Sequence, residues 1–370
     1  MHRIKVLQIG AENFGHGGRS VIAYGLTKYM PSDIQNDFLA YTHCIKNRVT
    51  DDIETRGNIV WIDSNYIIQT IKMIRKNKYD IVHIHADNAY EALKMALLSK
   101  LGNGKAKIVV HGHSTSTNKS LWFKTLMIKI SRLFLGSVAD LKIAVSKEAA
   151  VYMYGYDKDI QIIKDGIDLK NYGFNPLTRD NIRKELKIDN DFVIGNVGRL
   201  TYQKNQKFLI NIFKELLRVI PNSKLLLIGD GPDRKDLVNK ITDCHLEKKV
   251  LLLGNRDDVP DLLQAMDFFV FPSKYEGFGI AALESQASSL PTLVSDVVPD
   301  SLCQTRLCSK MRLSEGCNSW SKAIIEKCIT FEQRIKVSSK IQIALKKNGF
   351  DLFDSSMKLL KMYRRLVNAD

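Results

Sequence analysis

Two glutamates around a glycine-spaced loop, Glu276 and Glu284, have the spacing that most clearly suggests chemistry. An apolar run ends at Phe271, Gly277-Phe278-Gly279 follows, and a helical pattern begins near Gly279. The free N–H groups at the start of such a helix can hold a diphosphate. Glu284 lies about one turn inside, among alanines and a leucine, where a carboxylate is costly to bury without partners. Ribose hydroxyls would satisfy Glu284, with a neighbouring lysine or arginine as the alternative, and Glu276 could accept hydrogen bonds from sugar hydroxyls.

Two cations follow another apolar run. Arg199 comes directly after Gly198, and Lys204 precedes a helical stretch. Arginine with paired donors and lysine as a point charge could clamp a diphosphate. A solvated turn is the alternative for either residue alone. Gly229-Asp230-Gly231 marks a tight turn, and its composition predicts mainly a scaffold that brings backbone close to a ligand.

Histidines and glycines mark the first half of the chain. His111 and His113 close an apolar run, where an imidazole could donate a hydrogen bond to a sugar or shuttle a proton. No carboxylate-rich loop accompanies them, so we predict no metal site. His83 and His85 lie two residues apart on a further run, and we expect only one of them to face a ligand. The loop Gly15–Gly18 precedes a helix and predicts either an anion contact or a plain turn.

Short β-branched runs alternate with longer helical stretches, the pattern of parallel sheets covered on both faces. The alternation restarts near residue 175, so the 370 residues predict two doubly wound α/β domains, 1–172 and 173–349. In such sheets ligands collect at the carboxyl ends of the strands. Five loops are expected at these ends: Gly15–Gly18, His111–His113, Gly198-Arg199, Gly229–Gly231 and Glu276–Gly279. The expected strands are Lys5–Ile9, Asp80–Ile84, Lys107–His111, Lys142–Val145, Ile160–Ile163, Phe192–Val197, Lys224–Ile228, Val250–Leu253, Phe268–Phe271 and Thr292–Ser295.

Together these residues resemble the retaining GT-B glycosyltransferases of family four, the glycosyl transferases group 1. The resemblance is most specific between residues 195 and 295. Its motifs are Gly198-Arg199-Leu200, Lys204-Asn205, Ile228-Gly229-Asp230-Gly231-Pro232, Phe271-Pro272-Ser273 and the glutamate pair around Gly277-Phe278-Gly279. Asp165-Gly166-Ile167-Asp168 is similar to the family's Asn-Gly-Ile-Asp segment, with Asp165 in place of asparagine. The first half matches more loosely, through Gly17-Gly18 and the histidine loop.

The resemblance implies two Rossmann-like doubly wound domains facing across a cleft, the first for the acceptor and the second for a nucleotide-sugar donor. It also implies that the helix at 350–370 packs back on the first domain. Arg199 and Lys204 would bind the donor diphosphate and stabilise it as the leaving group, and His111 would lie beside the transferred sugar. Glu276 would contact that sugar and Glu284 the ribose. The other implied donor-binding residues are Gly17, Gly18, His113, Gly229, Asp230, Asn255, Arg256, Gly277, Phe278 and Gly279. The family generally works without a bound metal or cofactor.

The segment Val294–Asp300 departs from the family's Gly-Gly-x-x-Glu run, and a cysteine-bearing stretch follows it. Together with Arg256–Pro260 it resembles a branch that builds bacterial capsule, exopolysaccharide or O-antigen. We therefore expect transfer of a hexose or N-acetylhexosamine from a UDP-sugar to a polyprenyl-diphosphate-linked saccharide. A GT-B epimerase or phosphorylase is the alternative. The sequence leaves the donor sugar, the linkage and the oligomeric state open.

The composition of the chain restricts the partners and the cellular compartment that can be expected. The net charge of +15 is spread over both halves and suits anionic partners, but no basic stripe carries the interleaved aromatics of a nucleic-acid binder. The six cysteines form no Cys-x-x-Cys pair and are expected to be incidental thiols of a reducing compartment. No apolar stretch is long enough to span a bilayer, and the start of the chain predicts a strand rather than a secretory signal. We expect a cytoplasmic protein.

The stretch 119–135 contains no acidic residue. On a helical wheel its apolar residues, among them Trp122, Phe123 and Leu133, share one arc, and Lys124, Lys129 and Arg132 share the other. A helix lying on the anionic inner face of the cytoplasmic membrane is built in this way. A helix that covers a sheet is the alternative.

Overall fold

The computed structural model describes residues 3–12, 14, 18–41, 48–63, 66–114, 122–276 and 278–368. The chain divides into two compact units. Unit 1 comprises Met1–Gly166 and Gly349–Asp370, and unit 2 comprises Ile167–Asn348. The division falls six residues before the expected boundary at 172/173, and the C-terminal segment belongs to unit 1.

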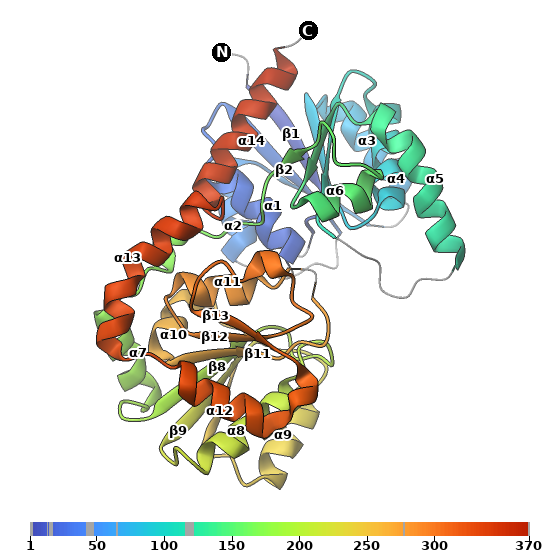
Figure 1. The fold of residues 1–370 in the computed structure, drawn as a ribbon. Coiled ribbons are helices and arrows are strands. Elements are labelled where there is room, and N and C mark those ends of the chain that lie inside the picture. The colour runs from blue at the N-terminus through green and yellow to red at the C-terminus, as the bar shows by residue number, and fades with distance from the viewer. Residues whose placement is uncertain are drawn as a thin grey trace. The chain divides into compact units, whose positions relative to one another are not determined.

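Unit 1 is built on a seven-stranded sheet of order β3-β2-β1-β4-β5-β6-β7, all parallel. Figure 1 shows helices on both faces of this sheet. The order reverses between β1 and β4, which is where open α/β sheets bind ligands. Its strands are β1 (Ile4–Ile9), β2 (Ile34–Tyr41), β3 (Ile59–Ile62), β4 (Ile81–Ala86), β5 (Lys107–Gly112), β6 (Leu141–Ala144) and β7 (Gln161–Ile162). Its helices are α1 (Gly18–Lys28), α2 (Arg48–Arg56), α3 (Tyr66–Asn77), α4 (Ala89–Gly102), α5 (Trp122–Val138), α6 (Lys147–Tyr154) and α14 (Leu352–Val367).

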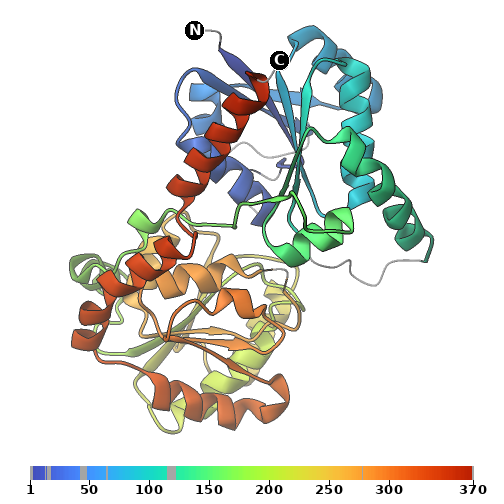
Figure 2. The ribbon, with the colours of Figure 1, turned by 45° about the horizontal axis from the view of Figure 1, so that its top comes forward.

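The last helix, α14, returns to unit 1 and packs against α1 (Figures 1 and 2). Ser356 Oγ donates to the carbonyl of Leu26 at 2.7 Å, and the Arg364 guanidinium meets Asp33 at 2.8 Å. A Cβ at Gly25 would lie 2.7 Å from Cδ2 of Leu352, so the lack of a side chain at this position lets the Leu352 side chain pack directly on α1. Tyr363 is fully buried over the sheet.

Unit 2 is built on a six-stranded parallel sheet of order β10-β9-β8-β11-β12-β13. The order reverses between β8 and β11, so the second point of ligand binding is expected there. Its strands are β8 (Phe192–Val197), β9 (Ser223–Ile228), β10 (Val250–Gly254), β11 (Phe268–Phe271), β12 (Thr292–Ser295) and β13 (Cys308–Met311). Its helices are α7 (Pro176–Leu186), α8 (Gln206–Leu217), α9 (Arg234–Asp243), α10 (Val259–Ala265), α11 (Ile280–Ala287), α12 (Gly316–Lys327) and α13 (Phe331–Lys347).

All ten expected strands form, and the structure adds β2, β3 and β13. β2 escaped prediction because it carries polar residues in its middle. Asn36 and Asp37 are both buried there, and Asp37 accepts hydrogen bonds from Tyr79 and Asn58. Cross-sheet partners of this kind are invisible in a pattern of apolar residues.

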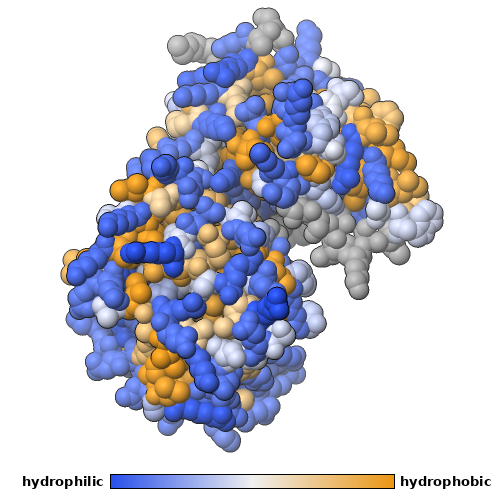
Figure 3. Space-filling view, in the orientation of Figure 1, coloured by the Kyte–Doolittle hydropathy of each residue, from blue (hydrophilic) through white to orange (hydrophobic). Residues whose placement is uncertain are grey.

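Helix α5 has two apolar faces. Ile128 and Leu135 are buried in the core of unit 1, so the helix does cover the sheet. The opposite face is exposed over its whole length, and Figure 3 shows apolar side chains gathered on the surface over this helix. The exposed apolar residues are Trp122, Phe123, Leu126, Ile130, Leu133 and Phe134. Among the described residues, no helix is both long enough and apolar enough to pass through a bilayer.

Candidate functional site

Two loops of unit 2 meet where its strand order reverses. One follows β8 and contains Arg199 and Lys204, and the other follows β11 and contains Glu276. Asn205 Nδ2 donates to the carbonyl of Pro272 at 3.1 Å, and Gln203 exchanges hydrogen bonds with residues 274 and 275. The predicted cations and the first predicted glutamate are therefore brought together by direct contacts between the loops that carry them.

Lys204 and Glu276 form an ion pair, with 2.5 Å between Nζ and Oε1. The side chains are 17% and 5% exposed, and Nζ also lies 4.6 Å from the centre of the Phe271 ring. Arg199 is exposed, and in the described part of the chain its guanidinium has no hydrogen-bond or ion-pair partner. These two loops thus hold one cation already neutralised by a carboxylate and one that remains open to an anion.

Glycines let the backbones of neighbouring loops touch. A Cβ at Gly229, whose φ is +127°, would lie 2.2 Å from the carbonyl oxygen of Gly198, and a Cβ at Gly231 would lie 2.4 Å from that of Leu200. Between these glycines, the carbonyl of Asp230 accepts from the Leu200 N–H at 3.0 Å, and its carboxylate accepts from the Gly231 N–H. Asp230 thus stabilises the turn, which fits the predicted scaffold role.

Helix α11 begins after Gly279, which has a φ of +96° and provides no side-chain cap. Its first N–H groups are therefore not capped by a side chain and can donate hydrogen bonds to an anion. Phe278 is partly buried beside them.

Glu284, one turn inside α11, accepts a hydrogen bond from the Tyr172 hydroxyl at 2.7 Å. Burial raises the pKa of the Glu284 carboxyl, and the bond from Tyr172 acts in the opposite direction. The partner of this carboxylate is thus a tyrosine rather than the lysine or arginine weighed from the sequence. Sequence reasoning missed Tyr172, and its only signal was its place four residues after the Asp165–Asp168 motif.

The remaining predicted donor-binding residues have mixed surroundings. Asn255 is exposed after β10. Arg256 forms hydrogen bonds to both oxygens of Asp258, at 2.7 and 2.5 Å, and these bonds raise its pKa further. Gly18 is the first residue of α1, whereas Gly17 and Gly277 lie outside the described residues.

Four histidines form one array on unit 1. His85 is paired in register with His111 across β4 and β5, and the rings of His83 and His85 stack with 4.2 Å between their centres. The expectation that only one of His83 and His85 faces a ligand assumed that they point to opposite faces of the strand. This assumption was wrong, because residues two apart on a strand point to the same face. His113, just past the end of β5, completes the array, with its ring centre 4.3 Å from that of His111.

The imidazoles of this array differ in their hydrogen bonds. His83 Nδ1 lies 2.5 Å from the Tyr363 hydroxyl of α14, and burial lowers the pKa of His83 to about 3. His111 is fully buried, and neither of its ring nitrogens has a hydrogen-bond partner among the described residues. Burial also holds the pKa of His111 well below its usual range. His113 lies nearest the carboxyl edge of the sheet, so it is the better placed of the two predicted imidazoles to reach a ligand.

Comparison with known proteins identifies the family. Residues 54–171 match the model of Glycosyltransferase Family 4, and residues 178–301 match that of Glycosyl transferases group 1. The chain belongs to the group 1 glycosyltransferases. The two loops of unit 2 that follow β8 and β11 both lie inside the second match.

Curated relatives and solved structures agree with this family. The glycosyltransferase is 33% identical over 250 residues to an Escherichia coli UDP-Gal:alpha-D-GlcNAc-diphosphoundecaprenol alpha-1,3-galactosyltransferase, covering 64% of the chain and 62% of that relative. It is 25% identical to EpsF of Bacillus subtilis (strain 168), a protein assigned as a glycosyltransferase, over 96% of the chain and 95% of EpsF. The crystal structure of Anabaena HepE with UDP and glucose superposes with a TM-score of 0.78 at 18% identity, over 97% of this chain and 99% of that one. The two-domain GT-B fold is thereby confirmed.

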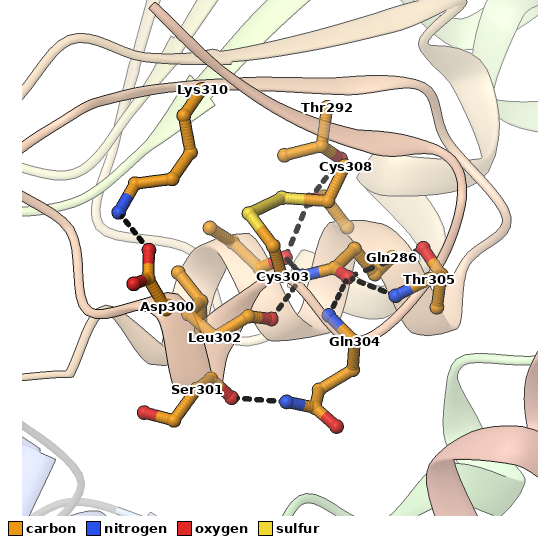
Figure 4. The surroundings of a disulfide bond; sticks show 12 residues. Gln286, Thr292, Asp300, Ser301, Leu302, Cys303, Gln304, Thr305, Cys308 and Lys310 are labelled. Atoms are coloured by element: carbon orange, nitrogen blue, oxygen red, sulfur yellow. Dashed lines mark hydrogen bonds and ion pairs between the residues drawn. A yellow bond between two sulfur atoms is a disulfide. The ribbon is translucent and has the colours of Figure 1, made fainter.

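The glycosyltransferase departs from its sequence-based prediction at the cysteines. Cys303 and Cys308 form a disulfide, with 5.2 Å between their Cα atoms, so they are not incidental thiols. The pairing is possible because the turn before β13 brings the two residues back together. Figure 4 shows the same turn held by Gln286 of α11, whose Oε1 accepts from the N–H groups of Gln304 and Thr305. The disulfide loop is therefore fastened to the helix that carries Glu284.

Proposed function

We propose that this glycosyltransferase moves a hexose or N-acetylhexosamine from a UDP-sugar to a lipid-linked saccharide, with retention of the anomeric configuration. The product would be a repeat unit of a bacterial capsule, exopolysaccharide or O-antigen. The observation that carries the proposal is the meeting of Arg199, the Lys204–Glu276 pair and the uncapped start of α11 at one strand-order reversal. Support for the acceptor class comes from the E. coli relative and from a Campylobacter jejuni N-acetylgalactosaminyltransferase, since both names state a diphospho-undecaprenol acceptor.

The proposed chemistry centres on the leaving diphosphate. Negative charge develops on it as the bond to the sugar breaks, and preorganised positive groups stabilise that charge. Arg199 is open to the diphosphate, whereas Lys204 must exchange Glu276 for it. Glu276 is then released toward the hydroxyls of the donor sugar. In this proposal side chains and helix N–H groups supply the positive charge, and no metal or cofactor is assigned to the step.

Glu284 would hold the ribose through its hydroxyls, with Tyr172 fixing one carboxylate oxygen. Asn255 and Arg256 would present backbone to the base. On unit 1, His111 would lie beside the transferred sugar and His113 would bind the donor. Gly17 and Gly18 would contact the diphosphate.

A thermal-shift panel of UDP, UDP-galactose, UDP-glucose, UDP-N-acetylglucosamine and GDP-mannose tests the donor. A ligand at 100 times its dissociation constant stabilises the native state by about 2.7 kcal/mol. We expect a response to UDP and to at least one UDP-sugar, and no response to UDP from Glu284→Ala. Glu326→Ala, which changes an exposed glutamate of the same unit, should respond like the wild type. A full response from Glu284→Ala would remove Glu284 from the site, and release of free sugar without acceptor would favour the epimerase alternative.

The exposed face of α5 supports a peripheral membrane contact as part of this function. Trp122 and Leu133 are 78% and 77% exposed, Lys124 and Lys129 are exposed beside them, and residues 119–138 contain no acidic side chain. An apolar face flanked by lysines fits a surface of anionic lipid, where each lysine adds about 1 kcal/mol of attraction. Arg132 was predicted to lie with Lys124 and Lys129 on the charged side of the helix. It instead lies over the Tyr152 ring at 5.2 Å and is partly buried.

Flotation with vesicles rich in phosphatidylglycerol tests this contact. We expect the wild type to float and Lys124→Glu/Lys129→Glu to remain in the lower fraction. Lys72→Glu/Lys76→Glu makes the same change of charge on exposed lysines of α3 and should still float. Equal flotation of all three proteins would refute the membrane contact.

A further inference from the structure

Three imidazoles of unit 1 come together near the carboxyl ends of β4 and β5. His83 and His85 lie two residues apart on β4, so their side chains share one face of the sheet. His111 of β5 is paired in register with His85. Each imidazole offers one ring nitrogen such that these three atoms all lie within 4.8 Å of one another, and none of the three residues is more than 3% exposed. The sheet thus gathers three nitrogen ligands in one buried position.

Several nitrogens of this set have no partner of their own. Among the described residues, His83 Nε2 and both ring nitrogens of His111 are buried without a hydrogen bond. A buried polar atom without a partner is costly, so native structures keep few of them. The two rings lie face to face with 5.5 Å between their centres, so the unpaired atoms are neighbours. Their proximity indicates a ligand from outside the chain.

The second nitrogen of two of these rings is held by a neighbouring polar side chain. His83 Nδ1 lies 2.5 Å from the Tyr363 hydroxyl. His85 Nε2 lies 3.0 Å from Oε1 of Gln8, whose Nε2 donates to Asn36 Oδ1 at 2.8 Å. Histidines that ligate a metal almost always have their other ring nitrogen fixed in this way, because the contact sets the tautomer and the orientation of the ring. Tyr363 and Gln8 are placed to give the same support to His83 and His85.

The spacing of the rings suits a small ion after a modest rotation. Zinc binds imidazole nitrogens at about 2.0–2.1 Å, so the ligand nitrogens of a tetrahedral site lie about 3.4 Å apart. The widest pair here has to close by up to about 1.4 Å. The rings of His83 and His85 stack with 4.2 Å between their centres, and rotation about χ1 and χ2 turns them toward a common point while the strands stay in place. Arg19 of α1 faces His85, but its charge is paired with Asp87 at 3.0 Å.

The donor set favours a transition metal. Imidazole nitrogen suits Zn²⁺, Cu²⁺ and Ni²⁺, whereas Mg²⁺ and Ca²⁺ take oxygen ligands. A histidine ligand must be neutral, and burial holds the pKa of His83, His85 and His111 below the usual range, so protons compete little near pH 7. His113 Nε2 lies 2.9 Å from His85 Nδ1, so this fourth imidazole is close enough to complete a tetrahedral set.

We propose that His83, His85 and His111 bind a transition-metal ion such as Zn²⁺. All three ligands belong to unit 1 and are buried, so the ion would fasten the carboxyl end of β4 to that of β5 rather than act on a substrate. The proposal departs from the sequence-based expectation of no metal, which rested on the lack of a carboxylate-rich loop beside the histidines. It does not depend on the proposed sugar transfer, to which no metal is assigned.

Titration of the chelator-treated full chain with Co²⁺ tests the site, because the visible absorption of Co²⁺ is strong in tetrahedral sites and weak in octahedral ones. We expect a strong band that saturates at one Co²⁺ per chain and disappears when Zn²⁺ is added. His83→Gln and His111→Gln should abolish it. His245→Asn, at an exposed histidine of unit 2, and Cys328→Ser, at an exposed free cysteine, should keep it. The absence of a strong band in the wild type overturns the proposal, and so does a band that survives in either variant of the ligands.

Tyr363→Phe addresses the site without removing a ligand, in case the histidine variants fail to fold. It removes only the hydroxyl beside His83 Nδ1. The affinity for Zn²⁺ in competition with a chelator should fall about tenfold, the usual effect of losing such a supporting group. Tyr24→Phe, at a hydroxyl of the same unit that donates to Asp52, should leave the affinity unchanged. An unchanged affinity in Tyr363→Phe would overturn the three-histidine site. None of these measurements requires sugar transfer, so their outcome is distinguishable from failure of the proposed function.

Discussion

The two sheets of this glycosyltransferase share a topology but differ in how they treat polar side chains at the carboxyl edge. In unit 2 the edge carries partly exposed charges, with Arg199 open and Lys204 held by Glu276. In unit 1 the edge carries stacked imidazoles that are buried and mostly neutral. Equal position in similar folds therefore leads to opposite electrostatics, because burial and charge pairing rather than topology determine which form of a titratable group is stable.

The difference predicts that unit 1 is the acid-sensitive part of the chain. The folded pKa of His83 is about 3 and those of His85 and His111 are also lowered, so unfolded unit 1 binds more protons than folded unit 1. Stability is therefore present above the usual histidine pKa and is lost as the pH falls below it. Between pH 7 and pH 5 His83 alone should cost about 2 kcal/mol, and His85 and His111 should add to this loss, so the total is the largest of the expected effects.

Urea unfolding at several pH values measures this effect in each unit. In a Trp122→Phe background, Trp61 reports on unit 1 and Trp320 on unit 2. The unit 2 signal should stay nearly constant, since its one histidine, His245, is exposed. Equal acid sensitivity of both signals would contradict the assignment of neutral imidazoles to unit 1.

Lys204→Met should have the next largest effect, and in unit 2. It leaves the Glu276 carboxylate buried without its cation, and breaking a buried pair in this way costs about 3 kcal/mol. The UDP response in thermal shift should disappear. The double variant Lys204→Met/Glu276→Gln should recover most of the stability but not the UDP response, which separates folding from binding. Lys207→Met, at an exposed pair on the next turn, is the matched control.

The sequence predicted unit 2 better than unit 1, for a physical reason. Glycines with positive φ and the start of a helix can be recognised from neighbouring residues in the sequence. The loops around Gly229 and Gly279 could therefore be predicted from composition. The hydrogen bonds of His85 to Gln8 and His113 join residues that are far apart in sequence, and no local pattern predicts a cross-sheet hydrogen bond. The mistake about His83 and His85 came from the side-chain period of a strand, and the missed tyrosine partner of Glu284 came from a contact over 112 residues.

The Cys303–Cys308 disulfide should stabilise unit 2 without affecting unit 1. In the loop-entropy account, a bridge that closes so short a loop contributes about 2 kcal/mol. Cys303→Ser/Cys308→Ser should lower the unfolding free energy reported by Trp320 by that amount and leave the Trp61 signal unchanged. Cys328→Ser, at an exposed free cysteine, is the control. Identical stability of the double variant and the wild type would show that the bridge does not stabilise unit 2.

Tyr172→Phe should give the smallest effect and the most specific one. A hydrogen bond to a charged group contributes about 1.5 kcal/mol, so UDP affinity should fall about tenfold if Tyr172 orients Glu284 for the ribose. The bond lowers a Glu284 pKa that burial raises, so its removal moves that pKa further up. The loss of affinity in calorimetry should therefore be greater near pH 5 than near pH 8, because a higher pKa leaves less of the Glu284 carboxyl ionised at the lower pH. A loss that is equal at both pH values would mean that Tyr172 only packs against α11. The hydrogen bond between Tyr172 and Glu284 would then stabilise the structure of unit 2 rather than orient Glu284 for the ribose.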